Sequence, residues 1–438
     1  MPKRIISENA DKETRFRIVM EGLLENNGEL KLPKSGTYSS IADDVSKWRF
    51  FAEKTDGMTT GFLVKKQAKL GAEKGTQTWI YKHEPGKDYT WYFYEHFGES
   101  VGGELFRYVL GDLAPKIRMT QLGSEPPGLV SRFISEFSTF KDQLKALHVQ
   151  SNIDEGDQEV AAQEEQRQKQ AFINNIATIT GIPKIVAANC FFNDFDGKLG
   201  NAGTFKTPDG RVKAARIDFG TALSNLHDHT YGLGLYLFGQ GEFSDRYRHH
   251  LTYASLLGSE TFKNEIEALS NIDMSHVEAI VKTSVARFVN AWKSIELGEE
   301  AIDKLYTHLY GSEKSMWANK GYMVHSNDPL PPKVSIDLEC FERTITSDIV
   351  ISLTDRKEIF VFFTKVLTCQ VELNKIATEA EYPSDPGKIE HRDLARSLIA
   401  EATDSNFSDQ KAKLISWATS GKLQLDHAEP PHSQYKSF

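Results

Sequence analysis

The chain has 438 residues, 39% of them hydrophobic, and a formal net charge of −9. This balance is typical of a globular protein, and the length allows one large two-part domain with an extension, or two to three ordinary domains. The negative charge argues against nucleic acid as the main partner, because an acidic chain gains nothing from counterion release. No apolar stretch approaches the about 18 residues of a transmembrane helix, and the N-terminus lacks the apolar core of a cleaved signal peptide.

The three cysteines, Cys190, Cys340 and Cys369, lie far apart in the sequence and form no C-x-x-C pair. A disulfide framework or a structural zinc site is therefore not expected. We interpret them as buried thiols in a reducing compartment.

Apolar residues (Phe16, Ile18, Val19, Leu23 and Leu24) lie among charged ones over residues 12–26, which predicts an amphipathic helix. Residues 61–70 are then expected to form a strand, and residues 71–75 a turn. The β-forming residues 76–82 predict the second strand of a hairpin.

The next predicted element is a helix over residues 99–110. Strands are expected over 119–122 and 129–137, joined by a turn at Glu125-Pro-Pro-Gly128. The pattern over 171–192 is helical, with a break at Gly181-Ile-Pro183.

A hairpin turn is predicted at residues 206–211, and from residue 225 onward the pattern is mostly helical. A proline-rich stretch at 328–332 is a plausible boundary before the last segment. The order of strands, one helix, strands and then many helices predicts an α+β fold, with a small β-rich part followed by a larger helical part.

Two short motifs carry the chemistry. Residues Asp196-Gly-Lys198-Leu-Gly-Asn201 fit the pattern D-x-K-x-x-N, and an apolar strand then ends in Asp218-Phe-Gly220. In such a loop Asp196 can orient an acceptor hydroxyl while Lys198 reaches a γ-phosphate. Asn201 and Asp218 are the expected ligands of a divalent metal, Mg²⁺ or Mn²⁺, on the phosphates of ATP.

The two motifs support each other because of their order. By average residue frequencies, D-x-K-x-x-N occurs by chance in roughly one chain in twenty of this length, and D-F-G within the next thirty residues has a chance of roughly one in two hundred. Together they predict phosphoryl transfer.

An upstream lysine completes the expected set. Lys82 ends a predicted strand, and Glu104 lies on the next predicted helix, so we expect the two to form the ion pair that holds the lysine against the α- and β-phosphates. Gly71 and Gly75 form either a shortened phosphate-covering loop or a simple hairpin turn. Glu136 begins the segment expected to receive the adenine of ATP.

These residues together resemble the atypical kinases among the bacterial type IV secretion effectors, which are distantly related to phosphoinositide 3/4-kinase-like and HipA-like kinases. The resemblance covers roughly residues 60–310 and is strongest over 99–118 and 190–220. It implies a divergent two-lobed fold, with the N-lobe in 1–138, the C-lobe in 139–327, and 328–438 as extra helices or a separate targeting domain.

The implied function is a Ser/Thr protein kinase that reaches the host cytoplasm without a cleaved signal peptide, possesses autophosphorylation activity and acts on a host protein. The sequence departs from the kinase pattern in three ways. Phe195 directly precedes Asp196, so the usual histidine and arginine are absent, and Asp194 is a second acidic candidate. No A-P-E follows D-F-G.

Three alternatives stay open. A phosphoinositide kinase needs a basic loop after D-F-G, whereas residues 221–231 contain no Lys or Arg. A pseudokinase or binding module would be favoured by a missing metal ligand, and transfer of AMP or another group by the same fold is also compatible with the sequence.

The absence of A-P-E leaves no obvious site for activation by phosphorylation. We therefore expect a host phosphorylated small molecule, such as an inositol polyphosphate, to act as an activator. The candidate site is a compact basic cluster formed by Arg246, Arg248, His249 and His250.

Overall fold

The computed structural model describes part of the chain. The described ranges are 48–53, 61–66, 77–82, 89–120, 127–148, 175–238, 253–293, 299–310, 323–325, 334–336, 338–378 and 407–419, together with 167, 171–172, 295, 297, 397–398 and 400–401. The predicted helix over 12–26, the turn at 71–75 and the proline-rich boundary lie outside these residues.

An antiparallel sheet of five strands forms the N-terminal part, in the order β1-β2-β3-β5-β4. Its strands are β1 (Trp48–Glu53), β2 (Gly61–Lys66), β3 (Gln77–Lys82), β4 (Ile117–Thr120) and β5 (Gly128–Arg132). The predicted hairpin of β2 and β3 is confirmed. Lys82 is the last residue of the central strand, opposite Gly61 on one side and Leu129 on the other.

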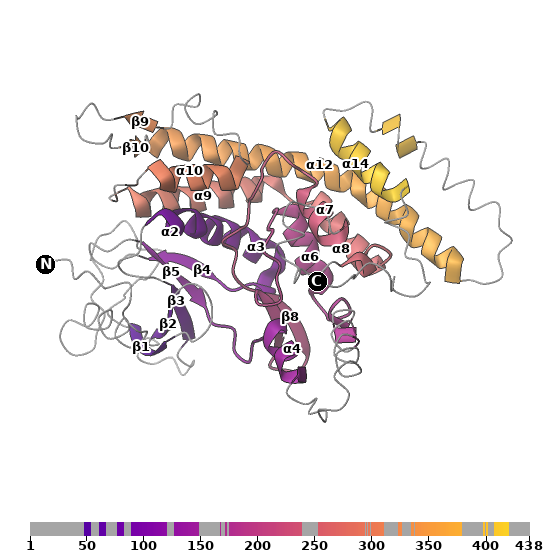
Figure 1. The fold of residues 1–438 in the computed structure, drawn as a ribbon, viewed down its shortest axis with the longest axis horizontal. Coiled ribbons are helices and arrows are strands. Elements are labelled where there is room, and N and C mark those ends of the chain that lie inside the picture. Colours follow the sequence, from indigo (N-terminus) through magenta and orange to yellow (C-terminus); the bar gives the residue numbers. More distant parts are fainter. Residues whose placement is uncertain are drawn as a thin grey trace, which may run out of the picture.

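A long helical segment follows β3. It consists of α2 (Tyr89–Phe97), a π-helical turn η3 (Gly98–Gly102), α3 (Gly103–Leu110) and a short 3₁₀ turn η4 (Gly111–Leu113). The predicted helix over 99–110 is confirmed, but the helical segment begins ten residues earlier. Figure 1 shows α2 and α3 between the sheet and the helices α9 (Met274–Trp292) and α10 (Glu299–Tyr310), which also contact α2 in space.

A second, three-stranded sheet lies below this layer. Its order is β6 (Ser138–Thr139), β7 (Ala202–Lys206) and β8 (Val212–Arg216). The predicted turn at residues 206–211 joins β7 to β8, and its Gly210 has a φ of +82°, a left-handed conformation that favours glycine. α4 (Phe140–His148) follows β6 and contacts both β6 and β7.

The helical part has at its centre α6 (Ile182–Phe191), a helix in which every residue except Lys184 is buried. It begins after Gly181, whose φ is +100°, and Pro183 lies in its first turn, so the predicted break is confirmed. α7 (Tyr231–Phe238), the short turn η5 (Ala254–Leu256) and α8 (Glu260–Ser270) follow it and precede α9. The expectation of a helical chain beyond residue 225 is thus confirmed over most of the described residues.

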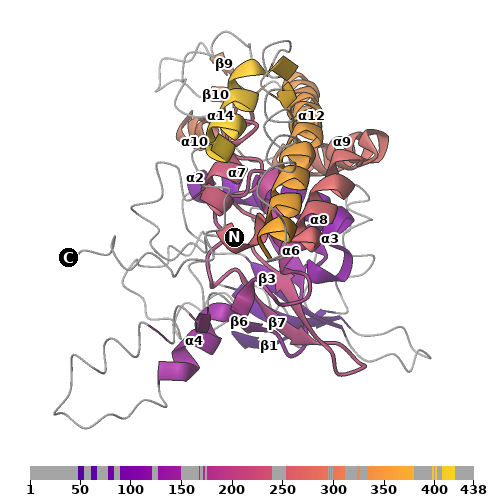
Figure 2. The ribbon, with the colours of Figure 1, turned by 90° about the vertical axis from the view of Figure 1, so that its right-hand side faces the viewer.

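A helix of 41 residues, α12 (Leu338–Thr378), crosses the outer side of the helical part. It packs on α6, α8 and α9, and α14 (Ser408–Thr419) lies alongside it, as Figure 2 shows. A short hairpin of β9 (Met323–His325) and β10 (Val334–Ile336) precedes it. Because α12 buries Ile345, Ile349, Leu353 and Phe360 in the same core as α6, this helix is a part of the main body.

The described elements therefore combine small sheets with many helices, which confirms the α+β class. Within the described residues, no helix combines the length and the apolar character that crossing a bilayer requires.

Candidate active site

Lys82 and Glu99 form an ion pair beneath the sheet. The lysine side chain comes from the end of β3 and is 14% exposed, and the glutamate comes from η3 and is 4% exposed. The Nζ atom of Lys82 also lies 4.0 Å from Oδ1 of Asp218. One lysine is thus shared by a helix glutamate and the aspartate of the D-F-G motif.

The prediction that Glu104 is the partner of Lys82 is wrong. The Glu104 carboxylate is ion-paired with Arg118 on β4 and lies 3.7 Å from Arg287 on α9. The physical reason is the π-helical turn η3, which carries Glu99 and interrupts the α-helical register, so Glu99 and Glu104 point in different directions although they lie five residues apart. Glu104 therefore faces β4 and α9 and links them.

Glu99 was missed by sequence reasoning, although a local signal marks it. Gly98, Gly102 and Gly103 surround it on the helix. A Cβ at Gly98 would lie 2.3 Å from the carbonyl oxygen of Gly220, and one at Gly102 would lie 2.4 Å from the Cβ of Ala222. The glycines thus mark the helix face that approaches the D-F-G loop most closely, and Glu99 lies beside that face.

The D-F-G segment is held tightly. Asp218 has a φ of +66°, a left-handed conformation that is uncommon outside glycine and costs free energy. Phe219 is fully buried, and its ring stacks on that of Phe106 with centroids 4.6 Å apart. The packed phenylalanine therefore fixes the position from which Asp218 faces Lys82.

The charged groups of this cluster shift one another's pKa values. Burial alone would raise the pKa of Asp218, but the positive charge of Lys82 holds it well below its usual value. Burial alone would lower the pKa of Lys82, yet Glu99 and Asp218 raise it. Burial raises the pKa of Glu95, one helical turn before Glu99, to about 7, and the charge of Asp218 adds to this shift.

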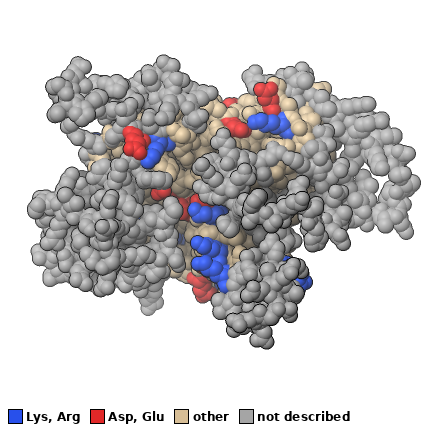
Figure 3. Space-filling model, viewed as in Figure 1, with Lys and Arg blue, Asp and Glu red and all other residues tan. Residues whose placement is uncertain are grey.

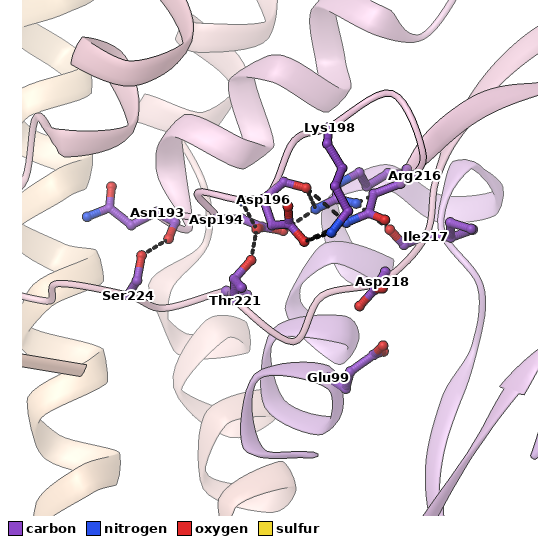
Figure 4. Close-up of polar contacts among 12 residues, drawn as sticks. Glu99, Asn193, Asp194, Asp196, Lys198, Arg216, Ile217, Asp218, Thr221 and Ser224 are labelled. Carbon is purple, nitrogen blue, oxygen red and sulfur yellow. Dashed lines mark hydrogen bonds and ion pairs between the residues drawn. The ribbon is translucent and has the colours of Figure 1, made fainter. Parts of the chain in front are cut away.

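The loop after α6 is organised by Asp194, which is completely buried. Its carboxylate accepts hydrogen bonds from Arg216 at 2.8 Å, from Thr221 at 2.5 Å and from the backbone nitrogen of Asp196 at 3.1 Å (Figure 4). Its backbone oxygen accepts one from Tyr236. Asp194 is thus inaccessible, and it connects the loop to β8 and to the segment after D-F-G.

Asp196 lies at the surface side of the same loop, with 16% of its side chain exposed. Oδ2 of Asp196 accepts hydrogen bonds from Lys198 at 2.7 Å and from Nδ2 of Asn201 at 2.9 Å. Burial raises the pKa of its carboxyl group, although Lys198 counteracts this effect. The structure therefore brings Asp196, Lys198 and Asn201 together.

The protein supplies only some of the oxygen ligands that a divalent cation needs. Asn201 uses its side-chain nitrogen on Asp196, so its oxygen is the atom that could bind a metal, and the Asp218 carboxylate is 46% exposed. Among the described residues, no group of three or more His, Cys, Asp or Glu side chains could hold a metal ion. Two oxygen ligands nevertheless fit Mg²⁺, which usually binds through one or two carboxylates with phosphates and water.

Glu136 is the one remaining predicted site residue that the structure describes. Glu136 is exposed in the turn between β5 and β6, at the passage from the first sheet to the second. Gly71 and Gly75 lie outside the described residues, as does the predicted activator cluster of Arg246, Arg248, His249 and His250. On the face drawn in Figure 3, several of the described Lys and Arg side chains adjoin Asp or Glu.

No protein-family model matches the chain, and no curated protein matches it. Among solved structures, it is similar to the proinflammatory kinase CtkA of Helicobacter pylori. The TM-score is 0.30 and the sequence identity is 12%, over 70% of this chain and 95% of that chain. At this level of similarity, only the geometry of the site bears on function.

Proposed function

We propose that this protein is an ATP- and divalent-metal-dependent phosphotransferase with a two-lobed, protein-kinase-like fold, acting as a Ser/Thr protein kinase. The observation that carries the proposal is the shared lysine: Lys82 is paired with Glu99 and lies 4.0 Å from Asp218. Phosphoryl transfer needs a positioned cation for the phosphates and an aspartate that holds metal beside it.

The nucleotide would bind between the five-stranded sheet and the loops after α6 and β8. Lys82 would neutralise the α- and β-phosphates, and Glu99 holds the lysine in place from the helix. Asp218 and Asn201 would hold the metal, which neutralises charge that develops on the phosphates. Glu104 has no part in this arrangement, because its partners are Arg118 and Arg287.

Asp196 would accept the hydrogen bond of the acceptor hydroxyl and take its proton during transfer. A buried carboxyl group with a raised pKa is a better proton acceptor than a fully solvated one, because its basicity lies closer to the operating pH. Lys198 is hydrogen-bonded to Asp196 and 42% exposed, so it can move to the transferred phosphoryl group.

A protein acceptor is favoured over a lipid headgroup. A phosphoinositide kinase needs a basic, accessible loop after D-F-G. Here Ala222, Leu223, Ser224 and Leu226 of that segment are buried. The role as a bacterial effector in a host cell rests on the sequence resemblance alone.

The test is transfer of the γ-phosphate from labelled ATP, with Mg²⁺ or Mn²⁺, to generic protein acceptors and to the protein itself. Wild type should transfer label, and Asp218→Asn should not. Asp209→Asn is the matched control, because Asp209 is an exposed aspartate in the β7–β8 turn. Equal transfer by wild type and Asp218→Asn would overturn the proposal.

A further inference from the structure

A buried arginine joins α12 to the two loops of the site. Arg356 is 0% exposed in the middle of α12. Its guanidinium donates hydrogen bonds to the backbone oxygens of Phe191 and Asn225, each at 3.1 Å. Phe191 ends α6, directly before the loop that carries Asp196, and Asn225 lies seven residues after Asp218. One side chain therefore bridges the catalytic loop and the segment after D-F-G.

The segment after D-F-G needs such support. Leu223 and Asn225 have φ values of +65° and +49°, left-handed conformations that cost free energy unless neighbours hold them. A second α12 side chain contributes, since the hydroxyl of Ser352 donates to the backbone oxygen of Leu226 at 2.6 Å. Backbone nitrogens of Asn225 and Leu226 donate to carbonyls at the end of α10.

Asn193 completes the connection to the catalytic loop. Its side-chain nitrogen donates to the backbone oxygens of Asn225 at 3.1 Å and Asp228 at 2.9 Å. Asn193 directly precedes Asp194, which orders the backbone of Asp196. Arg356 is thus connected to Asp196 through the end of α6 and Asn193. It is connected to Asp218 through the segment that follows the D-F-G motif.

The chemistry of Arg356 argues for more than a core-filling role. Its Nε atom has no hydrogen-bond partner, and no described carboxylate forms an ion pair with it. Burial lowers the pKa of Arg356 to about 9, although the charges of Asp228 and Asp355 act in the opposite direction, and it stays charged at neutral pH. Burying an unpaired charge is unfavourable, so an apolar side chain would serve stability alone better. What the guanidinium adds is a rigid fork that fixes two carbonyls at once.

We propose that Arg356 is a positioning residue of the catalytic centre, through which α12 holds the loop of Asp196 and the segment after Asp218 in one fixed arrangement. The proposal rests on the proposed function and adds to it a requirement for the C-terminal helix. The segment after D-F-G is then ordered by contacts within the chain, without phosphorylation.

The test compares variants of the full-length protein. Arg356→Met removes the fork while keeping an unbranched apolar stem, and Arg356→Lys keeps the charge with a single ammonium. Leu367→Ala is the matched control for lost stability, because Leu367 is fully buried on α12 and lies about three helical turns beyond Arg356. Arg343→Met controls for loss of an arginine from the exposed face of α12.

Two measurements separate positioning from folding. The first is kcat and KM for ATP, measured well below the unfolding temperature of each variant. Arg356→Met should lower kcat about 10–100-fold, the usual scale for outer groups that orient a site, with KM changed less than about 3-fold. Arg356→Lys should lie between this variant and wild type, while both controls should keep the wild-type kcat.

The second measurement is amide hydrogen exchange over residues 221–228, which needs no activity. Exchange there should rise about 10-fold or more in Arg356→Met relative to Leu367→Ala. Equal exchange and equal kcat in these two variants would overturn the proposal. If Arg356→Met does not fold, the same comparison with Arg356→Lys decides it. Wild type that lacks ATP turnover would refute the proposed function, and the exchange result would still decide whether Arg356 positions the segment.

Discussion

Lys82 on the central strand of the sheet is ion-paired with Glu99 on the helical segment that follows it. Because the pair is buried, the loss of Lys82 leaves Glu99 without its counterpart, and the loss of Glu99 leaves Lys82 with Asp218 alone, 4.0 Å away.

We predict that Lys82→Met and Glu99→Gln each lower ATP turnover roughly 10²–10³-fold, the scale of removing one charge-stabilising group from an active site. The double variant should lose little more than either single variant, because both changes break one unit. Glu104→Gln is the control, and its turnover should stay within a few-fold of wild type. Steady-state kinetics of the four variants checks this. Additive losses, or a larger loss in Glu104→Gln, would contradict it.

The two aspartates of the catalytic loop should respond differently to the same change. Asp196→Asn should lower kcat about 10²–10⁴-fold with little effect on stability, as expected for loss of a general base. Asp194→Asn should lower the free energy of unfolding by about 3–5 kcal/mol, because Arg216 would remain buried with its charge unpaired. Urea unfolding together with kinetics distinguishes them. An Asp194→Asn protein as stable as wild type would show that the buried pair is not needed.

The close approach of the helix to the D-F-G loop makes Gly98 sensitive to substitution. A Cβ there would meet backbone atoms of Phe219 and Gly220, which cannot rotate away. Gly98→Ala should therefore lower stability by about 1–3 kcal/mol and lower turnover as the loop shifts. Gly111→Ala is the control: its φ of +60° with ψ of −126° is a conformation that favours glycine and brings strain of about 1–3 kcal/mol, but no atom lies within 4 Å, so turnover should be retained. Thermal unfolding and kinetics of both variants test this prediction. Equal turnover in Gly98→Ala and Gly111→Ala would count against it.

The stability of the segment after D-F-G should depend on pH through His229. Burial, and next the charge of Arg356, lower the pKa of its imidazole to about 4, although the charge of Asp228 acts in the opposite direction. The carboxylate of Asp355 lies 3.6 Å from its Nε2. The unfolded chain binds this proton near pH 6.5, so the stabilisation is complete above that pH and is lost as the pH falls toward 4.

His229→Gln has no such group, so its stability should fall less between pH 7 and pH 4.5. The expected difference is about 1–2 kcal/mol, reduced from the full value of the shift by solvent and by Asp355. Urea unfolding at several pH values gives this difference directly. Parallel pH profiles for wild type and His229→Gln would show that the imidazole does not titrate as expected.

Local patterns were enough to predict the strands and turns next to the site. The alternation over residues 76–82 predicted the strand that ends in Lys82, and the Pro-Asp-Gly sequence predicted the turn between β7 and β8. The pattern could not identify the partner of Lys82, because a helix carries several glutamates and only the packing decides which one faces the sheet. The predicted helix begins at residue 99, whereas the helical segment begins at Tyr89. Without its true start, the sequence does not show which helix face carries each glutamate.

Long-range contacts explain the other differences. Nothing near Arg356 in the sequence indicates that it would reach carbonyls 165 and 131 residues away. The buried role of Asp194 likewise depends on Arg216 and Tyr236, which come from later elements. The motif places Asp194 and Asp196 in one loop. Only their burial in the structure distinguishes the structural Asp194 from the accessible Asp196.

The packing behind α2 has a consequence for chemical inhibition. Phe93 and Phe97 pack against Phe288 of α9 with ring centroids 5.1 Å apart, and Phe93 also meets Trp292 at 5.2 Å. A drug-like compound that acts by pushing this helix outward would have to open this aromatic cluster. Exposing each such side chain costs about 1.5–3 kcal/mol. This cost would offset much of the favourable free energy of binding, so the compound would bind weakly. Compounds directed at this protein should therefore be designed for the arrangement in which Lys82 and Glu99 are in contact.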